Sequence, residues 1–189
     1  FKDVFQLATI KTPELIKKLL RLLAYQAGSE VSVNELSKSL SMARSTVEKY
    51  LDLLEAAFVI FRLPAFGTNP RKEITKSQKI YFWDTGVRNA LLKDFSMNRT
   101  RSDIGSLFEN WIVAEAAKKN MLYGNRKSIY FWRSKGNSEV DLIIKNNEEI
   151  SAFEIKWNKN RSNKKAFSEK YNVPVTVINK DNFYPFIET

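Results

Sequence analysis

The hydrophobic periodicity changes along the chain, and this change limits the folds that are available to it. In the first part, apolar residues such as Leu15, Leu19 and Leu22 recur at helical spacing. In the last part, apolar residues come in short runs that are typical of strands. A chain of 189 residues is long enough for two small domains. The sequence therefore predicts an α+β protein with a helical domain first and a strand-rich domain afterwards.

Three helices are expected in residues 1–70. Thr12 can cap the first helix, Pro13 suits its first turn, and Gly28 ends it. The second helix spans residues 32–40 and begins with capping-box spacing, and the third carries an apolar face followed by a strand at 58–63. Three helices with a tight turn between the second and third, then a strand, are the order of a winged helix-turn-helix domain. We expect that domain over residues 1–70.

The third helix would be the one that enters the major groove of DNA. Its exposed start carries hydroxyls and cations that can reach phosphates or base edges, namely Arg44, Ser45, Thr46 and Lys49. The same helix carries three acids that would repel phosphate, namely Glu48, Asp52 and Glu55. Winged helices also serve as protein-docking or spacer modules. DNA contact and a spacer role therefore both stay open.

The segment 71–102 is predicted to be a basic connector with one short strand and one short helix. The chain has 31 Lys and Arg against 21 Asp and Glu, and this connector carries the densest positive charge. Arg71 and Lys72 are candidates for phosphate contact, because such a balance favours polyanionic partners. A solvated surface explains the charge equally well. The aromatic run Tyr81–Trp83 is expected to be a buried strand, with base stacking as the alternative.

Histidine and cysteine are both absent from the sequence. Their absence excludes disulfides, thiolate nucleophiles, His-containing triads and the usual zinc sites. A metal bound through Asp and Glu alone would be a hard cation such as Mg²⁺, with Mn²⁺ as the alternative. No apolar run approaches the ~20 residues needed to span a bilayer, so we expect a cytoplasmic protein that does not enter the membrane. The missing initiator Met suggests a fragment of a longer chain.

Residues 103–189 show the clearest order of elements. The pattern predicts an αβββαβ domain with a helix at 103–120, strands at 128–133, 139–145 and 150–157, a basic helix at 161–170 and a strand at 173–178. Polar residues interrupt two of the apolar strands, at Asp141 in one and at Glu154 and Lys156 in the next. A turn centred near Asn147 would make Asp141 and Glu154 cross-strand neighbours.

Two acids and a lysine would then meet. Paired carboxylates repel each other unless a cation or a proton lies between them, so Asp141 and Glu154 are predicted metal ligands. Lys156 would orient or deprotonate a water, or neutralise charge that develops on a phosphate. The alternative is an ordinary surface salt bridge, which contributes about 0 to 1 kcal/mol.

The residues EVD, a twelve-residue interval and then EIK resemble the signature of the PD-(D/E)XK nucleases. The resemblance implies a restriction-endonuclease-like domain in which Asp141 and Glu154 bind magnesium and Lys156 assists the attack of water on a phosphodiester. It also assigns Glu109 in GSLFENWIVAE as an auxiliary acid, with an ion pair to Arg133 as the alternative. Val140 stands where the family signature has proline.

The ordered segments TVEKYLDLLEAAFVIFRLP, KIYFWDTG, GSLFENWIVAE, YFWR, EVDLIIK and FEIK resemble the C-terminal half of bacterial and archaeal AAA+-like ATPases. The resemblance covers nearly the whole chain, and it implies an ATPase module upstream. The chain contains no GxxxxGK[ST] motif, so ATP would bind only to that upstream module.

The sequence thus predicts a module that associates with nucleic acid, expected to be DNA, and with an upstream ATPase. The basic residues near the predicted metal site are candidates to hold phosphates, namely Lys159, Arg161, Lys164 and Lys165. Hydrolysis of phosphodiesters is the leading interpretation. A non-catalytic binding module that regulates the ATPase, or a protein scaffold, is the alternative.

Overall fold

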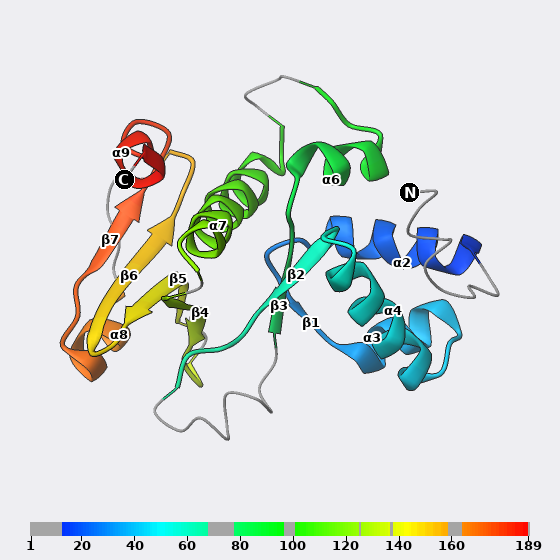
Figure 1. Cartoon of the computed structure of the whole chain (residues 1–189), viewed down its shortest axis with the longest axis horizontal. Helices are drawn as coiled ribbons and strands as arrows, with labels where there is room; N and C mark the ends of the chain where they lie inside the picture. Colours follow the sequence, from blue (N-terminus) through cyan, green and yellow to red (C-terminus); the bar gives the residue numbers. More distant parts are fainter. Residues whose placement is uncertain are drawn as a thin grey trace. The chain divides into compact units, whose positions relative to one another are not determined.

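The computed structural model describes residues 13–67, 78–96, 101–124, 126–136, 138–158 and 164–188. The chain divides into two compact units. In the described part, the first unit holds residues 13–62 and 78–96, and the second holds residues 63–67 and those from 101 onwards (Figure 1). Each unit combines helices with one sheet, of three and four strands respectively. The predicted α+β class is therefore confirmed.

The first unit begins with the helices that the apolar spacing predicts. Its elements are α2 (Pro13–Tyr25), β1 (Glu30–Val31), α3 (Val33–Leu40), α4 (Arg44–Ala56), β2 (Ile60–Leu63), β3 (Gln78–Phe82) and α6 (Thr85–Leu92). Ser32 caps α3 through its side chain, which accepts a hydrogen bond from the Glu35 N–H at 3.4 Å, as the capping-box spacing indicates. The two-residue strand β1 was not predicted.

The sheet of the first unit has the strand order β1-β3-β2. Strand β1 is antiparallel to β3, with Glu30 opposite Lys79 and Val31 opposite Gln78. Helix α6 packs against α2, and the Arg88 guanidinium donates to the Ala24 carbonyl at 3.2 Å. The described part of the segment predicted as a separate connector therefore contributes β3 and α6 to the first unit. The predicted boundaries differ from the observed units at this point.

One apolar core holds the first unit together. The helices and the sheet bury side chains at helical and strand spacing, which removes apolar surface from water. The core residues with the lowest exposure include Ile16, Leu19, Leu23, Val47, Leu54, Ile60 and Phe82. Tyr81 and Phe82 are buried in β3. The prediction that this aromatic run is a buried strand is therefore confirmed for these two residues.

The start of α6 offers a test of local stability. The Asp84 carboxylate accepts hydrogen bonds from the N–H groups of Gly86 and Val87, and so satisfies two donors at the helix start. Asp84→Ala is expected to lower the free energy of unfolding by about 1 kcal/mol, as is usual for loss of an N-cap. Urea denaturation followed by circular dichroism measures the change, and Asp84→Asn is the control because it keeps a capping oxygen. Equal stability of the wild type and Asp84→Ala would contradict the capping role.

The second unit has the element order predicted from the sequence. Its elements are α7 (Ile104–Leu122), β4 (Ser128–Arg133), β5 (Glu139–Asn146), β6 (Glu149–Ile155), α8 (Lys165–Tyr171), β7 (Val175–Ile178) and the short α9 (Tyr184–Glu188). Helix α9 was not predicted. The sheet order is β4-β5-β6-β7, with β4, β5 and β6 antiparallel in turn and β7 parallel to β6.

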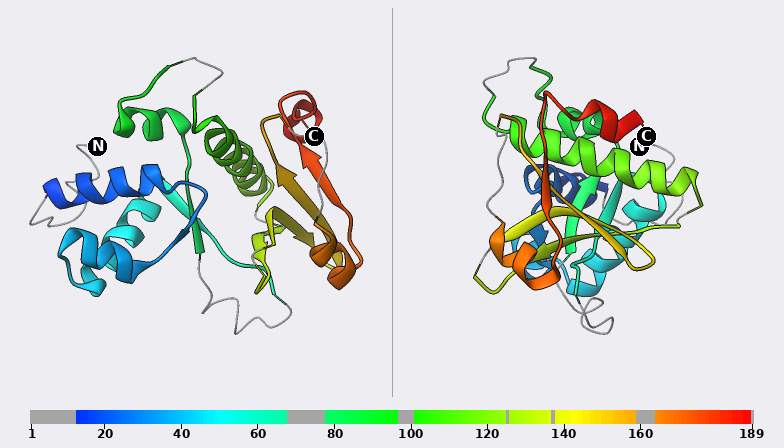
Figure 2. Two further views of the ribbon diagram at one scale, coloured as in Figure 1. Left: turned by 180° about the vertical axis from the view of Figure 1, so that it is seen from behind. Right: turned by 90° about the vertical axis from the view of Figure 1, so that its left-hand side faces the viewer.

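The two faces of this sheet are covered by different helices. Helix α7 lies across one face and contacts β6 (Figures 1 and 2). On the other face, Phe167 of α8 packs with Trp132, Ile143 and Ala152 in an apolar core. The sheet is therefore the central layer of the second unit.

A short segment outside the main strands lies along β4. Ala65 forms a parallel bridge with Phe131, the Phe66 N–H donates to the Phe131 carbonyl at 2.6 Å, and the Phe131 N–H donates to the Pro64 carbonyl at 3.0 Å. This segment satisfies backbone groups on the outer edge of the sheet. Among the helices of the described ranges, none has the length and apolar character needed to cross a membrane.

Candidate functional site

The β5–β6 hairpin sets the geometry of the predicted site. Its ladder runs from Asn146 opposite Glu149 to Leu142 opposite Phe153. The turn is thus formed by the two residues between, and Asn147 adopts a φ of 53°, a left-handed conformation that Asn tolerates well. This turn lies where the sequence predicted it. Continued by one step, the register places Asp141 opposite Glu154.

The two carboxylates and the lysine lie together in the structure. The Asp141 Oδ2 accepts hydrogen bonds from the Ile155 N–H at 2.7 Å and from the Lys156 Nζ at 3.2 Å. The Lys156 Nζ also lies 3.5 Å from the Glu154 Oε1. A second ammonium group, that of Lys164, lies 3.3 Å from the same Glu154 oxygen. Four charged side chains therefore share one small region at the end of the hairpin.

Burial separates this cluster from an ordinary surface salt bridge. The side chains of Asp141 and Glu154 are only 4% and 8% exposed, whereas those of Lys156 and Lys164 are 32% and 21% exposed. Burying a carboxylate costs free energy unless charges or donors compensate for the lost water. The ion pair of Lys156 with these acids, considered as the alternative, is present, but the two carboxylates are buried and do not lie at the surface.

The charge state of Lys156 follows from its surroundings. Burial disfavours its ammonium form, but attraction from Asp141, together with their hydrogen bond, and attraction from Glu154 and Glu109 outweigh the burial. The pKa of Lys156 is therefore raised above its ordinary value of 10.5. Lys156 is suited to neutralising negative charge at neutral pH and not to accepting a proton from water.

Glu109 comes to the same region from helix α7. Its negative charge is the smallest of the contributions that raise the pKa of Lys156. Arg133, the alternative partner of Glu109 in the sequence analysis, forms an ion pair with Glu139 at 3.1 Å. Three acids, Glu109, Asp141 and Glu154, thus act in the neighbourhood of two lysines.

The acidic side chains limit the kind of metal ion that this region could hold. In the described parts of the chain, no group of three or more acidic side chains is arranged closely enough to hold an ion by itself. Mg²⁺ keeps several of its waters and is often bound through one or two carboxylates together with substrate phosphates. Asp141 and Glu154 are a donor pair of this kind. If they held an ion, a hydrated Mg²⁺ or Mn²⁺ would suit them better than an ion enclosed by protein ligands.

The predicted reader helix belongs to the first unit. At the start of α4, Arg44, Ser45 and Lys49 are exposed and Thr46 is half-buried. The acids on this helix have cationic partners: the Arg44 Nη2 lies 3.7 Å from the Glu48 Oε1, and Arg62 of β2 forms ion pairs with Asp52 and Glu55. Arg62 was not singled out in the sequence, and it offsets part of the repulsion expected between this helix and phosphate.

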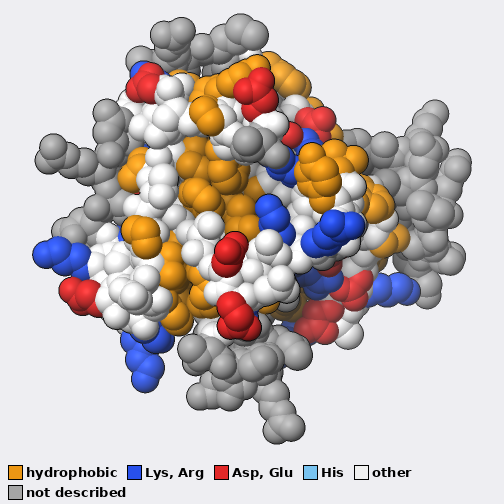
Figure 3. All heavy atoms as spheres, turned by 60° about the vertical axis from the view of Figure 1, so that its left-hand side comes forward, with side chains coloured by type: hydrophobic (Ala, Val, Ile, Leu, Met, Phe, Trp, Pro, Cys, Tyr) orange, Lys and Arg blue, Asp and Glu red, His pale blue; other side chains and the backbone are white. Residues whose placement is uncertain are grey.

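The other basic candidates have different positions. Lys164 contacts Glu154 and so belongs to the carboxylate cluster, while Lys165 is exposed at the first residue of α8. Arg71, Lys72, Lys159 and Arg161 lie outside the described residues. On the described part of the face drawn in Figure 3, Lys and Arg side chains are interspersed with acidic and hydrophobic ones. The basic composition does not form one continuous patch there.

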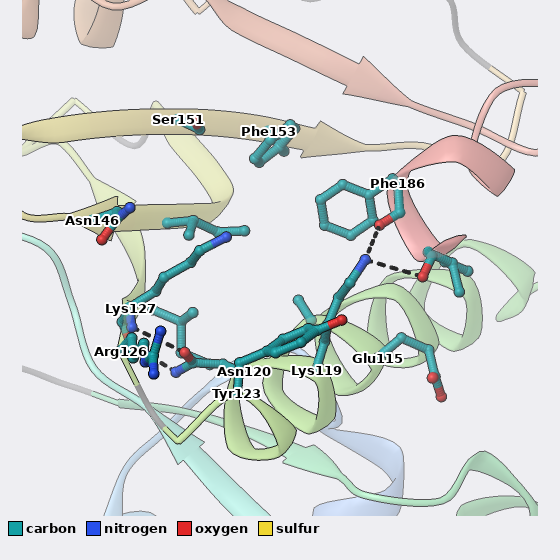
Figure 4. A pocket seen from close by; sticks show the side chains of 14 residues that line it. Glu115, Lys119, Asn120, Tyr123, Arg126, Lys127, Asn146, Ser151, Phe153 and Phe186 are labelled. Carbon is teal, nitrogen blue, oxygen red and sulfur yellow. Dashed lines mark hydrogen bonds between the residues drawn. The ribbon is translucent and has the colours of Figure 1, made fainter. Parts of the chain in front are cut away.

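Two cavities in the second unit were not predicted. The first, of about 560 Å³, lies between α7, the sheet and α9, and the predicted site residues do not line it. Figure 4 shows Lys119 and Asn120 of α7 and the following Tyr123 on one side of it, Ser151 and Phe153 of β6 on another, and Phe186 next to Lys119. The Lys119 Nζ donates to the carbonyls of Phe186 and Ile187 at 3.3 and 3.1 Å.

The second cavity, of about 420 Å³, is lined by Trp157, Asn158, Lys180 and Asp181. Trp157 follows Lys156 directly in the sequence, so this cavity begins one residue beyond the lysine of the carboxylate cluster. In the sequence, the tryptophan that follows the EIK residues was the feature that could have indicated this cavity. Lys180 and Asp181 join it only through the packing of β7 beside β6.

Comparisons with known proteins add relatives without an assigned function. An uncharacterized protein of Mycobacterium tuberculosis is 30% identical over 157 residues, which are 82% of this chain and 35% of that protein. An uncharacterized protein of Methanocaldococcus jannaschii is 29% identical over 79% of this chain and 32% of its own length. One from Haemophilus influenzae is 24% identical over 82% of this chain and 38% of its own length. The chain thus spans about a third of these curated relatives.

No solved structure matches the chain significantly. Two family profiles match it, and together they cover most of its length. Residues 104–188 match the domain of unknown function DUF4143, which corresponds to the larger part of the second unit. Residues 2–98 match the domain of unknown function DUF8612, which is more than half of the 189 residues. The chain belongs to the DUF8612 family and carries a DUF4143 domain after it.

Proposed function

We propose that the second unit is a nuclease-like domain of the PD-(D/E)XK type, which hydrolyses phosphodiester bonds with Mg²⁺ or Mn²⁺. The observation that carries the proposal is the meeting of two buried carboxylates, Asp141 and Glu154, with the Lys156 ammonium group between them. The order of elements around them, with one helix before three antiparallel strands and another before a parallel strand, agrees with the αβββαβ arrangement of these nucleases.

Each residue of the cluster has a role in this function. Asp141 and Glu154 hold the ion, which would polarise the phosphate and activate a water when bound. The Ile155 N–H orients the Asp141 carboxylate by donating to its Oδ2. Lys156, held as an ammonium group, stabilises the negative charge that develops on the phosphate oxygens in the transition state. Glu109 of α7 adds negative charge near the ion.

The first unit is proposed to be a winged helix that contacts DNA. Helices α3 and α4 are joined by a tight turn at Ser41, which has a φ of 52°, and β2 and β3 follow as neighbouring strands. The exposed start of α4, with Arg44, Ser45 and Lys49, would contact phosphates or base edges. Exposed Lys165 in the second unit would add a phosphate contact beside the carboxylate cluster.

A non-catalytic function has support of its own. Lys156 and Lys164 already provide positive charge beside the acids, so the cluster is partly compensated by the protein itself. The chain covers about a third of its curated relatives, so a longer protein containing it has room for an ATPase module. In this alternative the nuclease-like unit binds nucleic acid or protein and regulates that ATPase.

Calorimetric titration with Mg²⁺ and Mn²⁺ separates the two functions. The wild type is expected to bind one ion, and Asp141→Asn is expected to bind it at least about tenfold more weakly, because a charged ligand is lost. Glu169→Gln removes an exposed acid of α8 and serves as the matched control. Incubation of both variants with plasmid DNA and with single strands then measures cleavage. Absence of metal binding and of cleavage in the wild type would remove the hydrolytic function and leave the regulatory one.

A further inference from the structure

We propose that Trp157 is a stacking surface for an unpaired base, so that the carboxylate cluster acts on single-stranded nucleic acid in preference to an intact duplex. The inference rests on the nuclease-like function proposed above and specifies its substrate class. It is carried by three observations: the place of Trp157 beside Lys156, the cavity in front of it, and the aromatic cluster that holds it.

The first observation is the position of Trp157 along the chain and in the sheet. Consecutive Cα atoms are about 3.8 Å apart, so the backbone of Trp157 is next to that of Lys156. The Lys156 N–H donates to the Ile178 carbonyl at 3.0 Å, and the Lys180 N–H donates to the Trp157 carbonyl at 3.5 Å. The Trp157 backbone therefore lies just beyond the carboxyl ends of the parallel strands β6 and β7, which is where open sheets commonly bind their ligands.

The second observation is the cavity of about 420 Å³ lined by Trp157, Asn158, Lys180 and Asp181. Its volume is in the range of cavities that hold small ligands. The Lys180 ammonium pairs with Asp181 at 2.9 Å, but its side chain is 40% exposed and an ammonium group has three donors. An aromatic ring, an exposed amide and an accessible cation are thus available together. Proteins that bind single strands combine aromatic stacking with cations along the backbone in this way.

The third observation is that other rings hold the indole in place. Trp157 meets Phe108 edge to face with 5.4 Å between ring centroids, and Phe183 lies 6.1 Å from Phe108 and 5.2 Å from Trp111. Phe108 is buried, whereas Trp157, Trp111 and Phe183 keep part of their surface exposed. A side chain that only filled the core would be covered, and a mobile one would lose more entropy on binding. This indole is fixed and still accessible.

The preference for single strands follows from the stacking. In a duplex, both faces of a base are occupied by its neighbours, so an aromatic side chain can reach a base only after the base is flipped out, at a cost of a few kcal/mol. An unpaired base has no such cost. A stacking residue beside Lys156 would therefore favour loops, ends and single strands over a continuous duplex.

The test is a binding measurement without divalent ions, so that cleavage plays no part. Fluorescence anisotropy compares a labelled oligothymidylate with a duplex of equal length. The wild type is expected to bind the single strand more tightly. Trp157→Leu is expected to weaken single-strand binding about tenfold and to leave duplex binding unchanged, because stacking on one base is lost. Trp157→Phe keeps a ring and is expected to restore most of the affinity.

Two controls test whether the effect is specific to Trp157 and whether the variants are folded. Tyr123→Ala removes an exposed aromatic side chain of the same unit that lines the other cavity, and it is expected to leave both affinities unchanged. Thermal unfolding of each variant shows whether Trp157→Leu is folded, and Trp157→Phe provides the comparison if it is not. Equal affinity of the wild type for single strand and duplex, or unchanged affinity in Trp157→Leu, would overturn the inference.

The outcome is independent of the test of the proposed function. Binding of metal and cleavage of duplex DNA at rates unaffected by Trp157→Leu would leave the nuclease-like function standing and remove the stacking role. Tight single-strand binding through Trp157 without any metal binding would remove hydrolysis, and with it the substrate class, while keeping a stacking surface on a binding module.

Discussion

Lys156→Met is expected to reduce metal-dependent cleavage by roughly a hundred-fold to a thousand-fold, which is the usual effect of removing one group that stabilises transition-state charge. Lys156 is the side chain that lies close to both Asp141 and Glu154, with its Nζ at 3.2 and 3.5 Å from their oxygens. Methionine keeps most of the side-chain length and removes the charge together with the hydrogen bond that Lys156 donates to Asp141. Initial rates on a single-stranded substrate at saturating Mg²⁺ measure the loss.

The same variant is expected to be less stable. Removal of the ammonium group leaves two buried carboxylates facing each other, and because Lys156 is about a third exposed we expect a loss of about 1 to 3 kcal/mol in the free energy of unfolding. Added Mg²⁺ should restore part of this stability, since the ion replaces the lost charge. Lys135→Met, at an exposed position, is the control. Full activity of Lys156→Met would exclude the charge-stabilising role.

Phe167→Ala is expected to have the largest effect on stability, about 3 to 5 kcal/mol in the free energy of unfolding. Phe167 has no exposed surface, and its ring lies 5.2 Å from that of Trp132 and 4.8 Å from that of Tyr171. The substitution opens a cavity between α8 and the sheet. Because Lys164 directly precedes α8, we also expect its contact with Glu154 to loosen.

Guanidinium denaturation followed by tryptophan fluorescence measures the change, because Trp132 reports directly on this core. Phe95→Ala is the matched control: it removes the same side chain at a position that is 66% exposed and is expected to change stability by no more than about 0.5 kcal/mol. If the two alanine variants had the same stability, Phe167 would not support α8 as the structure indicates.

The hairpin and its polar residues were predictable because the information is local. Strand alternation fixes which residues share a face, and a two-residue turn fixes which residues are opposite each other. Asp141, Glu154 and Lys156 could therefore be brought together from sequence spacing alone. The helices of the first unit were equally predictable, since Ser32 and the leucine spacing mark their bounds.

Features that depend on distant segments were not predictable in this way. Strand β1 has two residues, too few for a periodic pattern, and it forms by pairing with β3 much later in the chain. The contact of Lys164 with Glu154 depends on how α8 packs under the sheet. The cavity beside Trp157 requires β7 to bring Lys180 next to β6. The spacing of residues along the sequence does not predict which of these segments become neighbours in the fold.

The assignment of segment 71–102 to a connector illustrates the same limit. Its strand was recognised from its apolar and aromatic residues, but a strand's partner is not encoded in its own composition. The pairing of Lys79 with Glu30 assigns β3 to the first unit, and the contact of Arg88 with Ala24 assigns α6 to it as well. Both assignments rest on contacts across more than forty residues of sequence.

The strip of backbone from Pro64 to Phe66 along β4 bears on how the protein can be divided for study. The two units are interleaved in sequence: residues 63–67 belong to the second unit, although β3 and α6 of the first unit come after them. No single cut separates the units. A truncated protein beginning near residue 104 would lack the partner of Phe131. The outer edge of β4 would then be unpaired, and unpaired strand edges favour aggregation. Fragments meant to isolate the carboxylate cluster should carry this strip on a short fused linker.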